Sequence, residues 1–202
     1  MSLAKVVIIE GPDRSGKQTQ TENLTSRLRA QGRKVKLIEV PIKSSIFTYK
    51  LIYWMLNNGM AKKFPNFFQT VQFINRLMFQ ITRLPFILLF YDYVIFDRWS
   101  LSSIVYGSAT GANVWMCKIF AKLLIGYDRM IILNGKTYNV GRETDDYEND
   151  DLLQIAVKQL YSKWASEHNL SGQYADLNVL EIDNRLQIDE ITDMIMRHIK
   201  YG

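Results

Sequence analysis

The chain has 202 residues, of which 48% are hydrophobic, so it is long enough to form one domain with a substantial core. Its net charge of +5 suits anionic ligands, but no basic run with interleaved aromatic residues indicates nucleic acid binding, and the longest apolar region, 84–96, is too short to span a membrane. The single cysteine excludes an intrachain disulfide and fits a reducing compartment, and no signal peptide pattern precedes Glu10, so we expect a cytoplasmic protein.

The first predicted element is a buried strand that leads into a phosphate-binding loop. The β-branched run 6–9 is typical of a strand buried on both faces of a parallel sheet. GPDRSGKQTQ follows, and Gly11, Gly16 and Lys17 have the spacing G-x-x-x-x-G-K. Leu24 and Leu28 then lie four apart, which predicts a helix. The alternative is an ordinary glycine-rich turn between a strand and a helix.

The residue after Lys17 departs from the usual pattern of such loops. Ser or Thr normally stands there and binds magnesium through its hydroxyl, but this chain has Gln18. The amide oxygen of Gln18 is a neutral donor of the kind that magnesium accepts. We therefore predict an ATP site with an altered metal contact, formed by Gly11, Ser15, Gly16, Lys17, Gln18 and Thr19.

The rest of the chain alternates between strand and helix patterns. Further strands are predicted at 36–40, 93–97, 130–133 and 179–183, and further helices at 45–57, 67–90, 114–125, 150–168 and 188–199. This alternation predicts an α/β fold with a five-stranded parallel sheet, helices on both faces, and a single domain over residues 1–202. Ligands of such sheets bind beyond the carboxyl ends of the strands.

Cations follow most of the predicted strands. They are Arg14 and Lys17 after the first strand, Lys43 after the second, Arg98 after the third, and Lys136 and Arg142 in the polar loop 134–150 after the fourth. Together they indicate a ligand with several phosphates, because Arg and Lys bind such groups. Asp97, at the end of the third strand, is placed to hold magnesium, and its alternative role is to cap a following helix.

These segments together resemble a known family. GPDRSGKQTQ, the pattern DRW…S…Y from Asp97 to Tyr106, the pair Asn75 and Arg76, and YEN at 147–149 are similar to the motifs of thymidylate kinases, in the same order and with similar spacing. That family transfers phosphate from ATP to deoxythymidine monophosphate (dTMP) with Mg²⁺, has a P-loop NTPase fold and usually forms a homodimer. The apolar helices 67–90 and 114–125 fit a homodimer, since they are more apolar than one buried face needs.

The resemblance implies a role for each matching residue. Asp13 positions the acceptor nucleotide, Arg98 binds its phosphate, and Tyr106 crowds the 2′ position and favours deoxyribose. Arg76 hydrogen-bonds the base and Ser102 lies in the base pocket. The catalytic residues are then Lys17, Arg14, Arg98 and Arg142, the last on a lid at about 134–150; Asp97 and Gln18 hold the metal.

The chain also departs from the family pattern on the acceptor side. Lys43 stands where an arginine is common, and Gln72 replaces the phenylalanine that stacks on the base. Phe68 and Phe73 flank Gln72 and are substitutes for that ring or members of the core. Two alternatives therefore stay open: a kinase of another or of several deoxynucleoside monophosphates, and a nucleotide-binding protein without catalysis.

Overall fold

The structure is a computed structural model of the chain and describes residues 3–136, 147, 150–169 and 178–201. Within these ranges, five parallel strands form one sheet in the order β2-β3-β1-β4-β5. The strands are β1 (Lys5–Glu10), β2 (Val35–Glu39), β3 (Tyr93–Asp97), β4 (Arg129–Asn134) and β5 (Val179–Asp183). The predicted five-stranded parallel sheet is therefore confirmed, and every strand begins and ends within one residue of its expected bounds.

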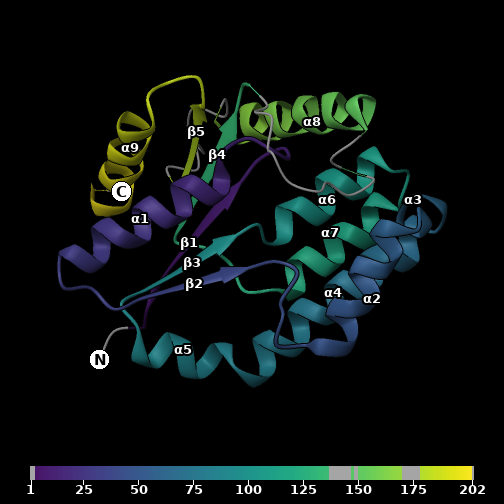
Figure 1. Cartoon of the computed structure of the whole chain (residues 1–202), viewed down its shortest axis with the longest axis horizontal. Coiled ribbons are helices and arrows are strands. Elements are labelled where there is room, and N and C mark those ends of the chain that lie inside the picture. Colours follow the sequence, from purple (N-terminus) through teal and green to yellow (C-terminus); the bar gives the residue numbers. More distant parts are fainter. Residues whose placement is uncertain (1–2, 137–146, 148–149, 170–177, 202) are drawn as a thin grey trace.

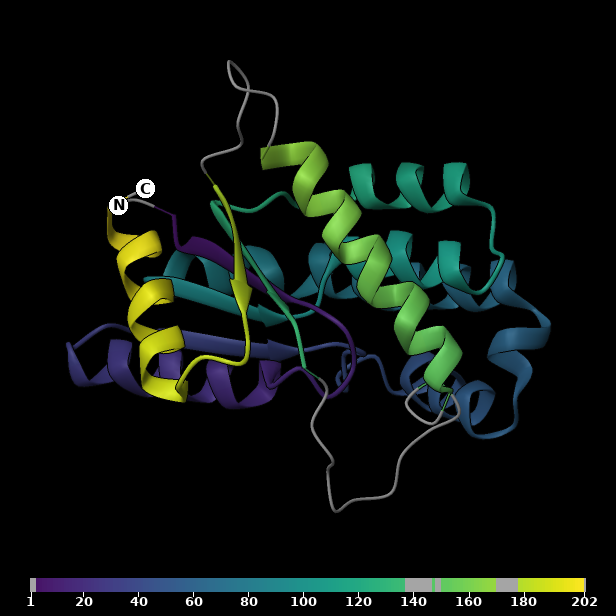
Figure 2. The same ribbon diagram turned by 90° about the horizontal axis from the view of Figure 1, so that it is seen from above.

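Helices cover both faces of this sheet, as Figures 1 and 2 show. Their order is α1 (Lys17–Ala30), α2 (Ile46–Asn57), α3 (Met60–Lys63), α4 (Pro65–Thr82), α5 (Leu84–Phe90), α6 (Ser100–Ala109), α7 (Val114–Leu123), α8 (Asp151–Asn169) and α9 (Ile188–Tyr201). Successive residues of β1 alternate between the faces: Val7 and Ile9 join the cluster with α1 and α9, and Val6 and Ile8 join the cluster on the other face.

The prediction of one helix over 67–90 is wrong, because α4 and α5 are separate helices that meet at Arg83 with a bend of 50°. Pro85 lies in the first turn of α5, where its missing N–H is tolerated; within a continuous helix it would remove a hydrogen bond. The short α3 and the ten-residue α6 were not predicted. Serines and the β-branched pair Ile104 and Val105 give α6 a weak helix signal.

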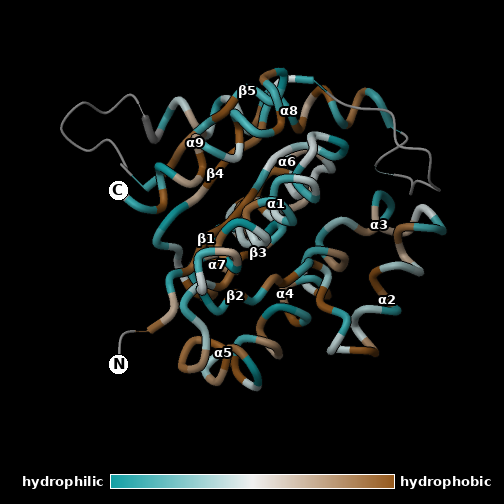
Figure 3. Tube along the Cα trace, turned by 60° about the vertical axis from the view of Figure 1, so that its left-hand side comes forward, coloured by the Kyte–Doolittle hydropathy of each residue, from teal (hydrophilic) through white to brown (hydrophobic). Residues whose placement is uncertain are grey.

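The helices α6 and α7 pack closely against each other at Gly107. A Cβ added to Gly107 of α6 would lie 2.7 Å from the Sγ atom of Cys117 on α7, so only glycine permits this approach. Cys117 is fully buried there. Figure 3 shows apolar strands at the centre of the molecule and an apolar α5 at its edge.

Of the described helices, none alone is long and apolar enough to cross a membrane, and only the bent pair of α4 and α5 passes that test together.

Candidate active site

The site lies at the carboxyl ends of β1 and β3, which are neighbours in the sheet. Ile9 pairs with Asp97, so the loop after β1 and the loop after β3 leave the sheet side by side. They line a cavity of about 870 Å³. The predicted residues that line it are Asp13, Arg14, Ser15, Gly16, Lys17, Gln18, Thr19, Lys43, Gln72, Arg76, Asp97, Arg98, Ser102 and Tyr106.

The phosphate-binding loop needs glycine at two positions. Gly11 has φ 148°, and a Cβ there would lie 2.3 Å from the carbonyl oxygen of Leu133. Gly16 has φ 84° and is the N-cap of α1, so the helix starts at Lys17 with its free N–H groups towards the loop. The N-terminus of α1 therefore lies at the loop for which the sequence predicts phosphate binding.

Lys17 is buried beside the loop that it serves. Its Nζ atom donates to the carbonyl oxygen of Pro12 and lies 3.5 Å from the Oγ atom of Ser15. Burial and the charge of Arg98 lower the pKa of Lys17 to about 8, against the opposing effect of nearby carboxylates. The amine is therefore held by neutral groups of the loop and available to a phosphate.

Asp13 and Arg98 form a partly buried ion pair that lines the cavity. Arg98 also donates to the carbonyl oxygen of Gly11 at 2.9 Å, and its guanidinium lies over the ring of Tyr106 at 5.0 Å. The hydroxyl of Tyr106 donates to Asp13 at 2.8 Å. Burial alone raises the pKa of Asp13, but the charges of Arg98 and Lys17 and the hydrogen bonds lower it, so that the net pKa lies below its ordinary value.

Two arginines of the site, Arg14 and Arg98, have an unusual backbone conformation. Arg14 has φ 59° and Arg98 has φ 67°, left-handed conformations that residues with a Cβ rarely adopt. Such conformations persist only where surrounding contacts determine them, and they gather at ligand sites. Both arginines line the cavity.

Two residues that the sequence analysis missed hold these groups in place. Gln154 on α8 accepts from the backbone N–H of Asp13 at 3.1 Å and donates to its carboxylate at 2.9 Å and to the carbonyl oxygen of Tyr147 at 2.9 Å. Glu10, fully buried at the end of β1, accepts from the backbone N–H groups of Trp99 at 2.8 Å and Ser102 at 3.3 Å. The partners lie far apart in the chain, so no local pattern signals either contact.

Glu10 also replaces the helix cap that the sequence suggested. The N-cap of α6 is Trp99, and no side chain of its own segment caps this helix. The Glu10 carboxylate accepts hydrogen bonds from the backbone N–H groups at the start of α6 and from the hydroxyls of Ser102 and Tyr161. Asp97 is left facing the cavity, and burial, the largest influence, raises its pKa against the charges of Lys17 and Arg98.

Side chains of α4 and α6 also line the cavity. Arg76 is 1% exposed and donates to the Oγ atom of Ser103 at 2.5 Å and to the Oε1 atom of Gln72 at 3.0 Å. Gln72 and Arg76 line the cavity. Phe68 does not line its described part: the ring is fully buried, edge-on to Tyr147. Phe73 stacks on Phe120 in the core.

Two predicted residues lie on the rim with partners of their own. Lys43 pairs with Glu39 at 3.1 Å, and both side chains are exposed. Gln18 is exposed, and its Nε2 atom donates to Glu22 at 3.0 Å. Gly11 is not among the described residues that line the cavity. Arg142 and most of the predicted lid fall outside the described residues.

Comparisons with known proteins all point to one family. The family model described as thymidylate kinase matches residues 9–195. A putative thymidylate kinase of Invertebrate iridescent virus 6 is 27% identical over 186 residues, which cover 90% of this chain and 85% of that protein. A solved structure of thymidylate kinase from Candida albicans has the same fold, with a TM-score of 0.77, 24% identity, and coverage of 99% of this chain and 92% of that one.

Proposed function

The chain belongs to the thymidylate kinase family, nucleoside monophosphate kinases that phosphorylate dTMP with ATP, and we propose how its own residues carry out this transfer. The observation that carries the proposal is the convergence of Lys17, Asp13, Arg98 and Asp97 on one cavity at neighbouring strand ends. The loop from Gly11 to Thr19 binds the phosphates of ATP, and Arg98 binds the phosphate of the acceptor.

Catalysis then consists of alignment and charge neutralisation. The second ionisation of a phosphate monoester has a pKa near 6, so the acceptor is mostly a dianion at pH 7 and needs no general base. No histidine lines the part of the cavity that the structure describes. Lys17 and Arg14 stabilise the charge on the transferred group, and Arg98 holds the acceptor oxygen in line with it. Arg142 is proposed to join them from the lid.

The residues of the site fit a magnesium ion. Magnesium in kinases is bound through one or two carboxylates and the phosphates of the nucleotide, and Asp97 places one carboxylate in the cavity. Gln18 lines the same cavity, and its amide nitrogen donates to Glu22, so its amide oxygen is left to act as a metal ligand. Asp97 and Gln18 would hold the ion, which would neutralise phosphate charge.

The acceptor is proposed to lie between Asp13, Tyr106 and the α4 side of the cavity. Tyr106 is 8% exposed and is fixed by Asp13 and Arg98, so its ring is a rigid wall beside the sugar. A rigid ring there leaves little room for a 2′ hydroxyl and favours deoxyribose. Lys43, engaged by Glu39 at the rim, assists the acceptor phosphate only after leaving that partner.

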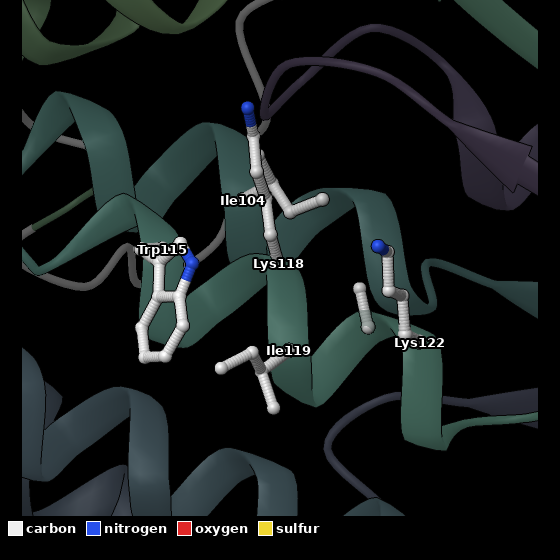
Figure 4. A pocket seen from close by; sticks show the side chains of 6 residues that line it. Ile104, Trp115, Lys118, Ile119 and Lys122 are labelled. Carbon is white, nitrogen blue, oxygen red and sulfur yellow. The ribbon is translucent and has the colours of Figure 1, made fainter.

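The protein is also proposed to be a cytoplasmic homodimer. Large apolar side chains are exposed on α4, α5 and α7, among them Ile81, Phe86, Phe90 and Trp115 at 64–72%. A hollow of about 320 Å³ opens beside Trp115, with Ile119 and Lys118 along it in Figure 4. Apolar surface of this extent is typical of a protein interface. The lone buried Cys117 supports a reducing compartment.

The test is the release of ADP from ATP with each common nucleoside and deoxynucleoside monophosphate. We expect turnover with dTMP, and Lys17→Ala should lower kcat at least a hundredfold while the folded state persists, because the mutation removes charge at the transferred group. Lys158→Ala, an exposed lysine on α8, serves as the control and should keep normal activity. Near-normal turnover of Lys17→Ala would contradict the assignment of the loop.

A further inference from the structure

Asn184 connects two loops that lie far apart in the sequence, the phosphate-binding loop after β1 and the chain that leaves β4. It follows β5 directly and is 3% exposed. Its Nδ2 atom donates to the backbone carbonyl oxygen of Ser15 at 3.0 Å and to that of Lys136 at 2.6 Å. Its Oδ1 atom accepts from the backbone N–H of Lys136 at 2.6 Å. One carboxamide therefore holds both loops through their backbones.

The position of Asn184 is itself fixed by its neighbours. Its backbone N–H donates to the carbonyl oxygen of Asn134 at 2.8 Å, directly after the last paired residues of β4 and β5. Gly135 has φ 128°, and a Cβ added there would lie 2.5 Å from the Oδ1 atom of Asn184. A residue with a side chain at position 135 would thus displace the carboxamide, and glycine allows it to reach both loops.

The hold on the carbonyl group of Ser15 also sets the direction of the next N–H group. In the planar trans peptide bond between Ser15 and Gly16, the carbonyl oxygen and the N–H point in opposite directions. Asn184 therefore determines where the N–H of Gly16 points, at the N-cap of α1. Phosphate-binding loops act through such backbone N–H groups, so their directions matter for affinity.

We propose that Asn184 is a positioning residue for ATP, which holds the phosphate-binding loop in the conformation that ATP binds. This inference rests on the proposed function and adds a residue to its ATP site. Asn184, Ser15 and Gly16 line the same cavity, so the contact lies at the site itself. A loop that is ordered before ATP arrives loses less conformational entropy on binding.

The effect should be confined to ATP, because the acceptor side has other supports. The acceptor phosphate is proposed to bind Arg98, which is held by Asp13 and by the carbonyl oxygen of Gly11. Neither of these contacts includes Asn184. A role in stability alone would not distinguish the two substrates in this way.

The test compares the dissociation constant for ATP and the KM for dTMP in the full chain and in Asn184→Ala. We expect the dissociation constant for ATP to rise about fivefold or more, because the loop is no longer held, and the KM for dTMP to change little. Gln187→Ala removes the same carboxamide from an exposed position of the loop after β5 and should alter neither constant. Thermal unfolding of each variant checks that it is folded.

Asn184→Asp separates hydrogen bonding from packing, and it keeps the proposal testable if Asn184→Ala does not fold. Aspartate has the same size and still accepts from the N–H of Lys136, but it sets an oxygen against the carbonyl oxygens of Ser15 and Lys136. We expect the dissociation constant for ATP to rise about tenfold, more than in Asn184→Ala. A role in packing alone predicts the opposite order, since aspartate preserves the volume.

The outcomes distinguish this inference from the proposed function. An unchanged dissociation constant for ATP in a folded Asn184 variant, or equal losses for ATP and dTMP, would overturn the inference and leave the proposed function intact. If the natural chain phosphorylates none of the monophosphates, the proposed function fails. Equilibrium binding of ATP and of dTMP to the same variants then still tests Asn184, with weaker binding of ATP alone as the expected result.

Discussion

Gln18 is the residue at which the phosphate loop differs from its usual pattern, and its side chain already has a partner. The bond from its amide nitrogen to Glu22 is exposed, so its net contribution is small and it can be exchanged for a ligand. Using the amide oxygen for magnesium then requires ordering a longer side chain than serine, which costs rotamer entropy.

We therefore predict that Gln18→Ser and Gln18→Thr lower the magnesium concentration needed for half-maximal activity, raise kcat, or do both. The measurement is a magnesium titration at saturating ATP and dTMP. Glu22→Gln, which keeps a partner for Gln18, is the matched control and should have little effect. Loss of activity in either Gln18 variant with the fold intact would show that Gln18 has a positive role of another kind.

Lys17 gives the site a dependence on pH. Its pKa is lowered to about 8, from an ordinary value of 10.5, so in the free enzyme the amine loses its charge as pH rises through about 8. The unfolded chain binds more protons between these values, so this residue makes folding stability rise with pH over that window.

The same loss of charge should weaken ATP binding. We expect the dissociation constant for ATP to be constant below pH 8 and to rise by up to tenfold per pH unit above it. Binding titrations between pH 7 and 9.5 measure this. Lys17→Arg keeps its charge over the whole range and should bind ATP with a flat profile; a flat profile for the natural chain would contradict the lowered pKa.

At the scale of elements, Glu10 connects β1 to the start of α6. It receives four hydrogen bonds, from two backbone N–H groups and from the hydroxyls of Ser102 and Tyr161. Glu10→Gln replaces one accepting oxygen by a donor, which should cost about 1–3 kcal/mol of unfolding free energy.

Because Arg98 lies two residues before α6 begins at Ser100, Glu10→Gln should also raise KM for the acceptor more than KM for ATP. Denaturant unfolding and steady-state kinetics measure the two effects. Glu190→Gln, an exposed change in the first turn of α9, is the control. A destabilised variant with an unchanged acceptor KM would limit Glu10 to a purely structural role.

Some of these elements could be predicted from the sequence, and others could not. The strands were predictable because each is a short, mostly apolar segment that contains β-branched residues. The loop after β1 was predictable because its spacing is local. The helix α6 was not, since its small and β-branched residues carry a weak signal. Gln154 was not either: its partner Asp13 is 141 residues away, so only the packing of α8 against the loop brings them together.

At the scale of the whole molecule, the exposed apolar faces of α4, α5 and α7 should form the interface of a homodimer. Sedimentation at micromolar concentration should give a mass near twice 23.6 kDa. Phe86→Lys places a charge in this surface and should shift the protein towards monomer. Ile155→Lys, the same kind of change at an exposed position of α8, should leave the mass unchanged. A monomer for the natural chain would contradict the proposal.

Because Gly107 packs closely on Cys117, the reactivity of this cysteine reports on the separation of α6 and α7. The only thiol of the chain is sealed between α6 and α7, and burial raises its pKa, so a thiol reagent reacts only when these helices separate. Since Ser102 and Tyr106 on the same helix line the cavity, a bound acceptor should slow this reaction. The rate at which Cys117 of the natural protein reacts with a thiol reagent thus measures how often the acceptor side of the cavity opens, without any engineered probe.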